Sequence, residues 1–274
     1  MCGLLGCEYI GRVVIIEQSE KIVVASKKTT SSESRKLNDR IAAHQKFTLP
    51  KLEDIKNFGH VAIYCFPDES LNIPVEVLSK FIQEHRFDFN ETLRYYPTIE
   101  PFQNCISVGY YPKAIRQDIK STVRITLYTD GFIAFDSQAD FLMSNEAFLV
   151  ATWLSYELQR HLQLSKTLLE NYGVKKINIF MDFKFIDNFS LTFGGRSFFS
   201  PQSSKYQGSH KPITRRIKLS EINEFNKEKR NIISPIIEDI MDEVSRIFGF
   251  SKTLSDCWDE NGYLTYVKGL ENRR

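Results

Sequence analysis

Several features typical of membrane and secreted proteins are missing from this sequence of 274 residues. No apolar run approaches the roughly 20 residues that a membrane-spanning helix needs. The opening residues, MCGLLGCEYIGRVVII, contain neither the basic region nor the long apolar region of a signal peptide. We therefore expect a cytoplasmic protein that does not associate with a membrane.

A large excess of charge of one sign is missing as well. The chain has 36 basic and 34 acidic residues, which gives a formal net charge of +2. Because the overall field is weak, any attraction to nucleic acid has to come from a local group of basic residues.

Motifs for metals and nucleotides are also absent. The five cysteines include no CxxC pair, and the five histidines are scattered singly along the chain. An odd number of scattered cysteines is typical of free thiols in a reducing compartment. Neither glycine-rich phosphate-binding pattern, GxxxxGKS/T or GxGxxG, occurs. The sequence therefore predicts no metal site and no cofactor.

The chain does contain enough apolar residues for a core, with 42% hydrophobic residues that include 21 Phe and 12 Tyr. A polar connector at 49–58 contains Pro50 and marks a candidate domain boundary. We expect a small N-terminal β-hairpin/helix segment at 1–50 and a main α+β domain at 51–274. Within the N-terminal segment, strands are expected at 12–17 and 21–25 and a short helix at 35–45.

Strand and helix patterns follow one another through the main domain. The clearest is a hairpin over 123–137, in which Asp130-Gly131 supplies the positive φ values of a tight turn. A long apolar stripe predicts a helix of about 27 residues, capped at Ser144 or Asn145 and ended by Gly173. Further strands are predicted at 60–66, 176–186, 189–193 and 215–219, and further helices after Pro74 and from Pro235 to Phe248.

Two regions are expected to lack regular structure, the aromatic stretch 87–112 and the Gly/Ser-rich loop 194–212. The aromatic stretch is a candidate contact surface for a partner, with burial in the core as the alternative. The order of elements favours an α+β fold, a mainly antiparallel sheet with two long helices packed on one face.

Asp182 and Lys184 alternate on one predicted strand and therefore face the same side. This spacing is half of a metal-dependent nuclease pattern, in which a carboxylate holds a divalent ion that activates water. Asp136 is the candidate for the further acid on a neighbouring strand. A solvated strand face produces the same spacing, so the pattern supports a nuclease only if these side chains meet in a cleft.

One local group of basic residues spans 205–218 without an intervening acid. Basic groups beside stackable rings can grip a single nucleic-acid strand. A phosphate-bearing small ligand and an unoccupied, solvated loop are the alternatives. The candidate nucleic-acid-binding residues are Lys205, Tyr206, Lys211, Arg215, Arg216 and Lys218, with His210 beside them.

Five landmarks in a fixed order carry a resemblance to a known family. They are GHVAIYCFPDE (59–69), ITLYTDGFIAF (125–135), LLENYGV (168–174), INIFMDF (177–183) and the closing pair IFGF and DENGYL within 247–264. Together they resemble the C-terminal half of bacterial Schlafen/AlbA-type putative DNA-binding proteins. We expect the AlbA-like domain that precedes this half in the family to be absent here.

The resemblance implies a bacterial cytoplasmic protein, a sensor or partner-binding module linked to regulation or phage defence. Our first hypothesis is therefore a non-enzymatic binding or regulatory module that acts through a protein partner or by self-association. Nucleic-acid binding through the basic residues of 205–218 is the alternative, and a metal-dependent nuclease is the third hypothesis.

Overall fold

The structure is a computed structural model that describes residues 35–52, 54–85, 95–112, 121–139, 148–192, 204–222 and 235–250. The chain divides into two compact units between Pro50 and Lys51, and each unit is described by itself. Several predictions lie outside the described residues: the hairpin at 12–17 and 21–25, the helix caps at Ser144 and Asn145, and the loop residues 194–203.

The described part of the N-terminal unit is a helix over residues 35–48. The helix predicted at 35–45 is therefore confirmed and extends three residues further. Its buried positions, Ile41, His44, Gln45 and Thr48, follow helical spacing and form one stripe. The predicted connector at 49–58 contains more structure than expected, a 3-10 turn at Leu49–Lys51 and helix α2 at Ile55–Phe58.

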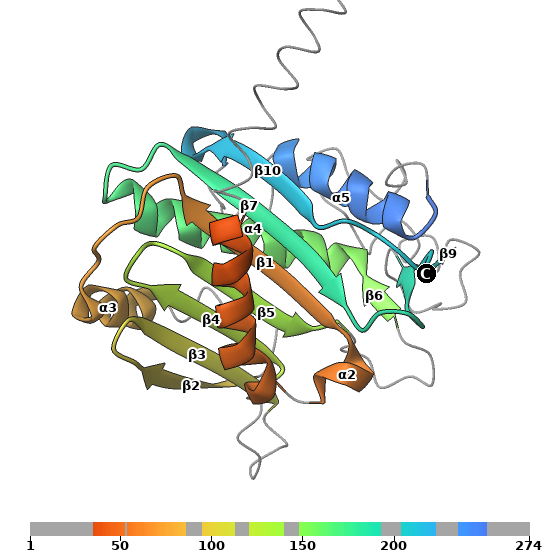
Figure 1. The fold of residues 1–274 in the computed structure, drawn as a ribbon, viewed down its shortest axis with the longest axis horizontal. Helices are drawn as coiled ribbons and strands as arrows, with labels where there is room; N and C mark the ends of the chain where they lie inside the picture. The colour runs from red at the N-terminus through yellow and green to blue at the C-terminus, as the bar shows by residue number, and fades with distance from the viewer. Residues whose placement is uncertain are drawn as a thin grey trace, which may run out of the picture. The chain divides into compact units, whose positions relative to one another are not determined.

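The main unit is built on a seven-stranded sheet with the order β10-β7-β1-β5-β4-β3-β2 (Figure 1). Every neighbouring pair in this sheet is antiparallel, which confirms the predicted α+β class. Its strands are β1 (His60–Pro67), β2 (Tyr95–Pro101), β3 (Cys105–Pro112), β4 (Val123–Tyr128), β5 (Ile133–Gln138), β7 (Lys176–Lys184) and β10 (Ile213–Lys218). A second sheet joins β6 (Phe148–Val150), β8 (Ser190–Thr192) and β9 (Ser204–Lys205).

The aromatic stretch 87–112 corrects one prediction, because it contains two strands where irregular structure was expected. β2 and β3 pair with each other over seven residues, from Tyr95↔Pro112 to Pro101↔Ile106. The prolines of this stretch argue against a strand in the sequence, since proline cannot donate a ladder hydrogen bond. β2 lies at the edge of the sheet, where one side of the strand needs no partner, so Pro97 and Pro101 are tolerated there.

The predicted hairpin is confirmed as β4 and β5. Gly131 has φ +85°, and the backbone N–H of Phe132 donates to the Asp130 carboxylate at 3.2 Å. The alternation of β4 predicts one buried and one solvated face, but all six residues of the strand are buried. Arg124 and Thr126 are 1% and 0% exposed, so this sheet is covered on both sides at its centre.

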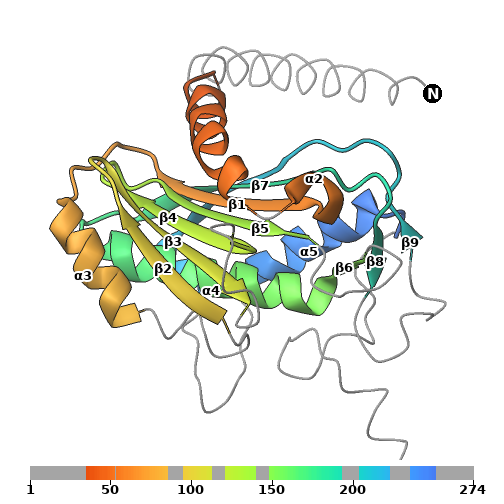
Figure 2. The same cartoon turned by 90° about the horizontal axis from the view of Figure 1, so that it is seen from below.

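Helices α3 (Val75–His85), α4 (Ala151–Glu170) and α5 (Pro235–Ile247) lie on the same side of the sheet (Figure 2). The prediction of two long helices is not confirmed in that form. α4 has 20 residues, not about 27: strand β6 takes up residues 148–150 before it, and a turn at 171–173 follows it. α5 has 13 residues and α3 has 11, and both contribute to the same core.

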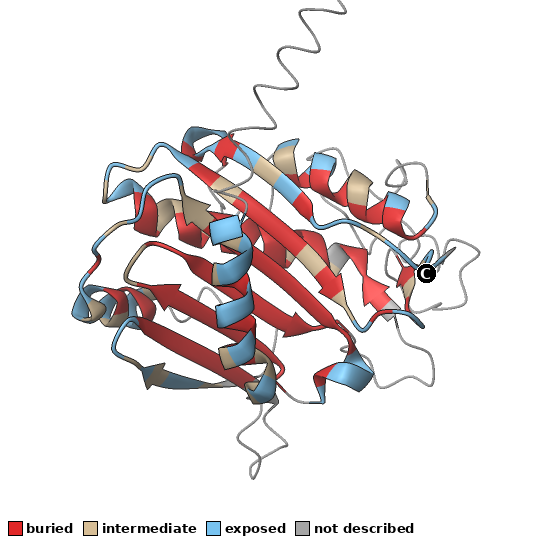
Figure 3. Cartoon of the chain, viewed as in Figure 1, coloured by how far each residue is buried: buried red, intermediate tan, exposed pale blue. Residues whose placement is uncertain are grey.

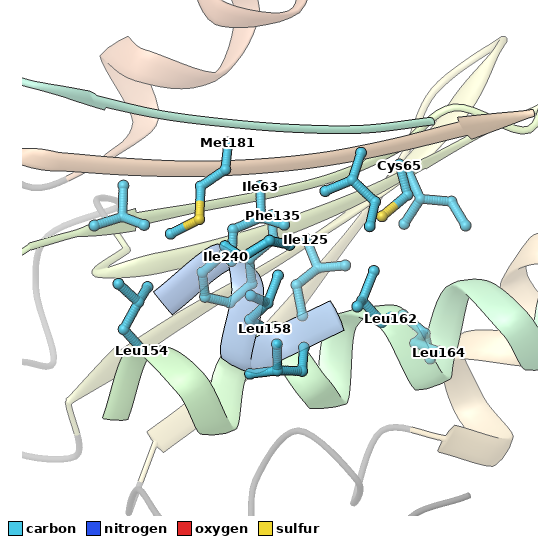
Figure 4. Packing of buried hydrophobic residues seen from close by; sticks show 14 of the residues in the cluster. Ile63, Cys65, Ile125, Phe135, Leu154, Leu158, Leu162, Leu164, Met181 and Ile240 are labelled. Carbon is cyan, nitrogen blue, oxygen red and sulfur yellow. The ribbon is translucent and has the colours of Figure 1, made fainter. Parts of the chain in front are cut away.

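The apolar core lies between the sheet and these helices. In Figure 4, side chains from the strands, such as Ile63 and Met181, point toward Leu158 of α4 and Ile240 of α5. Cys65 is fully buried here, and burial raises the pKa of its thiol to about 12. No helix among the described residues is both long and apolar enough to cross a membrane.

Candidate functional site

Most of the polar side chains of interest share the side of the sheet that faces away from α4. We call this side the polar face and the opposite side the helix face. Strand register aligns Asp182, Ala62, Asp136 and Arg124 in one row across strands β7, β1, β5 and β4. Side chains in such a row point to the same side of the sheet. Sequence reasoning had named the two acids and missed Arg124.

The centre of the polar face is a buried hydrogen-bonded group around Asp136. His60 Nε2 lies 2.9 Å from Asp136 Oδ1, and the hydroxyl of Tyr64 donates to the same oxygen at 2.8 Å. All three residues are fully buried, as the red strands in Figure 3 illustrate for this part of the sheet. A buried carboxylate requires such partners, so this group is a structural requirement of the fold.

A second group extends from Asp182 toward the surface. His210 Nε2 lies 3.1 Å from Asp182 Oδ1, and the hydroxyl of Tyr206 lies 2.8 Å from His210 Nδ1. Burial raises the pKa of Tyr206, and the charges of Asp187 and Asp182 act in the same direction. The phenol therefore stays protonated near neutral pH and serves as a hydrogen-bonding group. This contact attaches the segment around Tyr206 to β7.

The three residues of the nuclease pattern share the polar face but do not form one cluster. Asp136 and Asp182 lie on either side of β1, both in register with Ala62. Each carboxylate is held by its own histidine. Lys184 is in register with His60 rather than with either acid. Among the described residues, no three His, Cys, Asp or Glu side chains are placed to hold a metal ion.

The basic residues of 205–218 do not form a continuous patch. Arg215 and Arg216 are consecutive in β10 and therefore point to opposite faces of the sheet. Arg215 pairs with Asp239 and Glu243 of α5 at 2.5 Å each. Arg216 pairs with Asp68 on the polar face. The sequence could not show this division, because the acids come from distant parts of the chain.

The remaining candidates of this group are separated in the same way. Lys205 lies in β9, and Lys211 precedes β10, and both are exposed. Tyr206 is engaged by His210. Lys218 is exposed and lies directly opposite Lys176 of β7. Lys176 was missed by sequence reasoning, since only strand pairing brings it to Lys218.

A further polar group, around the buried Arg124, connects the edge of the sheet to its centre. The Arg124 guanidinium donates to Glu100 at 2.8 Å and to Ser107 at 2.9 Å. Lys51 donates to the same Glu100 carboxylate at 2.9 Å. Gly109 provides the room, because a Cβ there would come within 2.9 Å of the guanidinium. Burial would raise the pKa of Glu100, but Lys51 and Arg124 lower it.

Two exposed aromatic residues, Phe58 and Phe185, lie at one end of strands β1 and β7. Phe58 is 36% exposed and Phe185 is 41% exposed. Phe58 precedes β1 by one residue, Gly59, and Phe185 directly follows β7, so the pairing of His60 with Lys184 puts both at the same end of these two strands. Phe185 has φ +59°, a left-handed conformation that bulky residues rarely adopt. β7 ends at Lys184, so the alternation that buries Ile177 and Phe183 does not extend to Phe185.

The geometry thus contains hydrogen-bonded polar groups, a split set of basic residues and two exposed aromatic residues. The chain was compared with known proteins in three ways. No protein-family model, no curated protein and no solved structure matches it.

Proposed function

We propose that this protein is a non-enzymatic binding or regulatory module that acts through a protein partner. The observation that supports the proposal best is the exposed pair Phe58 and Phe185 at the β1–β7 end of the sheet. Exposed aromatic rings are enriched where proteins contact one another, because they bury much area with little loss of side-chain entropy.

The conformation of Phe185 adds a second argument. A bulky residue with positive φ costs on the order of 1 kcal/mol or more, and such residues concentrate at sites of function. Glycine or asparagine would adopt φ +59° more readily than phenylalanine. Retention of an exposed ring at this cost is expected if the ring has a binding role.

The state of the candidate catalytic groups argues against an enzyme. Asp136 is bound by His60 and Tyr64, and Asp182 by His210. These groups would have to give up internal hydrogen bonds before they could act on a substrate. Their arrangement is better explained by the need to satisfy buried polar atoms.

Self-association through the sheet edges is the weaker form of this hypothesis. The edge strand β2 contains Pro97 and Pro101, which interrupt its hydrogen-bonding capacity. The other edge strand, β10, exposes Arg216 and Lys218. Both features discourage the addition of another strand. We therefore favour a different protein as the partner over a second copy of the chain.

The proposal is tested with the double variant Phe58→Ser/Phe185→Asn in the full chain. The matched control is Val77→Ser/Ile99→Ser, which removes the two other large hydrophobic residues exposed among the described residues. Tagged proteins are treated with a lysine cross-linker in their host, and cross-links at Lys56 and Lys184, which flank the rings, are quantified. We expect a specific partner that is lost only in the aromatic variant. Equal capture by both variants would contradict the proposal.

Light scattering over a range of protein concentrations separates the two forms of the hypothesis. A monomer at all concentrations supports a different protein as partner. A dimer that dissociates in the Phe58/Phe185 variant identifies self-association instead.

Nucleic-acid binding is the second candidate function, favoured by the exposed lysines Lys205, Lys211 and Lys218. Arg215 no longer belongs to that site, because it pairs with α5. Binding of labelled single-stranded and duplex nucleic acids across a salt series tests it. A steep loss of affinity with salt that is weakened in Lys205→Gln/Lys211→Gln/Lys218→Gln, and unchanged in Arg215→Gln, would support this function.

The resemblance to Schlafen/AlbA-type proteins supplies the biological setting of our proposal, regulation or phage defence in a bacterial cytoplasm. A growth and phage-challenge assay of a deletion strain, complemented with the wild type or the Phe58/Phe185 variant, tests this setting.

A further inference from the structure

We infer that Lys176, Arg216 and Lys218 form a binding site for a phosphate group, and that Asp68 holds Arg216 in the absence of this ligand. The site lies on the polar face where β7 begins and β10 ends. It is distinct from the proposed partner surface, because Lys176 and Phe185 lie at opposite ends of β7.

The first argument is the register of the two strands. Lys218 is the direct cross-strand partner of Lys176, and Arg216 is the partner of Asn178. Side chains directly opposite in an antiparallel pair start about 5 Å apart, and diagonal neighbours about 7–8 Å apart. Three long cationic side chains therefore start close enough to reach one common anion.

The second argument is the electrostatic repulsion between Lys176 and Lys218. Like charges directly opposite each other destabilise a pair of strands. Lys176 and Lys218 are both exposed, and neither takes part in an ion pair of the described residues. A doubly charged anion between them would convert their repulsion into attraction.

The third argument is the position of Asp68, which already occupies the place of an anion. Its carboxylate accepts hydrogen bonds from Arg216 at 2.5 Å and from Asn178 at 2.9 Å. Partial burial raises its pKa, but these hydrogen bonds and the nearby charge of Lys176 lower it below the ordinary value. A carboxylate is therefore stabilised in its charged form beside Arg216 and Lys176.

Phosphate suits the site better than a second carboxylate. It has up to two charges at neutral pH and several strong acceptor oxygens, so it can bind two ammonium groups and a guanidinium at the same time. A carboxylate offers one charge, and Asp68 already supplies it. The phosphate can come from inorganic phosphate or from a phosphomonoester such as a nucleotide, since both present the same group.

The test measures binding of inorganic phosphate and of ATP to the full chain at low ionic strength, by calorimetry and by backbone NMR shifts. In the wild type we expect saturable binding with shifts centred on Lys176 and Lys218. Lys176→Gln/Lys218→Gln should weaken binding about tenfold or more, because hydrogen bonds to charged groups are lost. Asp68→Asn should tighten binding severalfold, because it removes the competing charge.

Arg215→Gln is the matched control, since Arg215 lies on the same strand but faces α5. Its affinity for phosphate should equal that of the wild type. The Lys176/Lys218 variant should unfold at an equal or slightly higher temperature, which shows that lost binding does not reflect lost folding.

Three results would overturn the inference. The first is no saturable binding of either ligand, even to Asp68→Asn. The second is an Arg215→Gln variant that loses affinity as strongly as the lysine variant. The third is binding of oligonucleotides without binding of phosphate or ATP, which would assign these residues to an extended nucleic-acid surface instead. Each result can occur whether or not a protein partner binds at Phe58 and Phe185.

Discussion

The two faces of the seven-stranded sheet are both buried at their centre, yet they are stabilised differently. On the helix face, Val61, Ile63 and Cys65 pack against apolar side chains of α4 and α5. On the polar face, the alternate residues His60 and Tyr64 hold a buried carboxylate. Apolar packing tolerates exchange of similar side chains, whereas buried polar groups depend on particular partners. The polar face therefore specifies register more strictly than the helix face.

The largest effect should come from removing the charge at the centre of the polar face. Asp136→Ala leaves the buried His60 and Tyr64 without their shared acceptor, so we expect a loss of about 4 kcal/mol in the free energy of unfolding. Urea denaturation measures it. Asp182→Ala is the control, because Asp182 is only partly buried and should cost much less. If Asp136→Ala lowers the free energy of unfolding no more than Asp182→Ala does, the centre of the polar face contributes no more to stability than its margin.

A cavity on the helix face should cost somewhat less. Leu158 of α4 is fully buried in the core that this helix forms with the sheet, so Leu158→Ala is expected to lose about 3 kcal/mol. The conservative change Leu158→Met should cost about 1 kcal/mol or less, since it retains volume. The same urea measurements apply. If Leu158→Met were as harmful as Leu158→Ala, the tolerance that we assign to apolar packing would be wrong.

His161 of α4 is buried against Phe135 of β5 and makes this side of the sheet sensitive to pH. Burial lowers the pKa of His161 to about 4, although the charge of Asp136 acts in the opposite direction. The unfolded chain takes up this proton near pH 6.5 and the folded chain only near pH 4, so stability falls as pH decreases between these values. At pH 5 the loss should be about 2 kcal/mol.

The variant His161→Leu should remove this part of the pH dependence and leave stability near pH 7.5 little changed. Chemical denaturation of both proteins at pH 7.5 and pH 5 gives the difference. Equal losses in the two proteins would show that other groups account for the acid sensitivity.

The smallest effect concerns the end of β7, where the alternation between the faces stops. Phe185→Asn should increase stability by about 1 kcal/mol, because asparagine accepts the left-handed conformation more readily. Thermal unfolding measures the gain, with Phe58→Asn as a control that lacks positive φ. A gain in stability together with lost partner binding would show that the ring at Phe185 is retained for function. A loss of stability would indicate that its packing outweighs its strain.

Local patterns predicted much of the fold. The continuous apolar run of β1, the Asp130-Gly131 turn and the apolar stripe of α5 each contain their own signal, and each is confirmed. β2 and β3 were missed, because Pro97 and Pro101 indicate a break in any strand except one at an edge. Whether a strand lies at an edge is a property of the assembled sheet, and the strand's own residues do not determine it.

The candidate sites depended still more on the assembled structure. From the sequence, Arg215 and Arg216 belong to one basic group and Asp136 joins Asp182. In the structure, α5 and Asp68 divide the arginines, and β1 separates the acids. The neighbours of a polar side chain come from strands that are distant in sequence, so spacing along the chain does not reveal them.

The sequence by itself determined the α+β class, the main strands and helices and the apolar face of most of them, because these follow from the period of apolar residues along the chain. Only the tertiary structure decided which strands are neighbours, that both sides of the central sheet are buried and which charges neutralise one another. Those outcomes depend on register and on contacts between distant segments, and a shift of one residue would exchange the two faces of a strand.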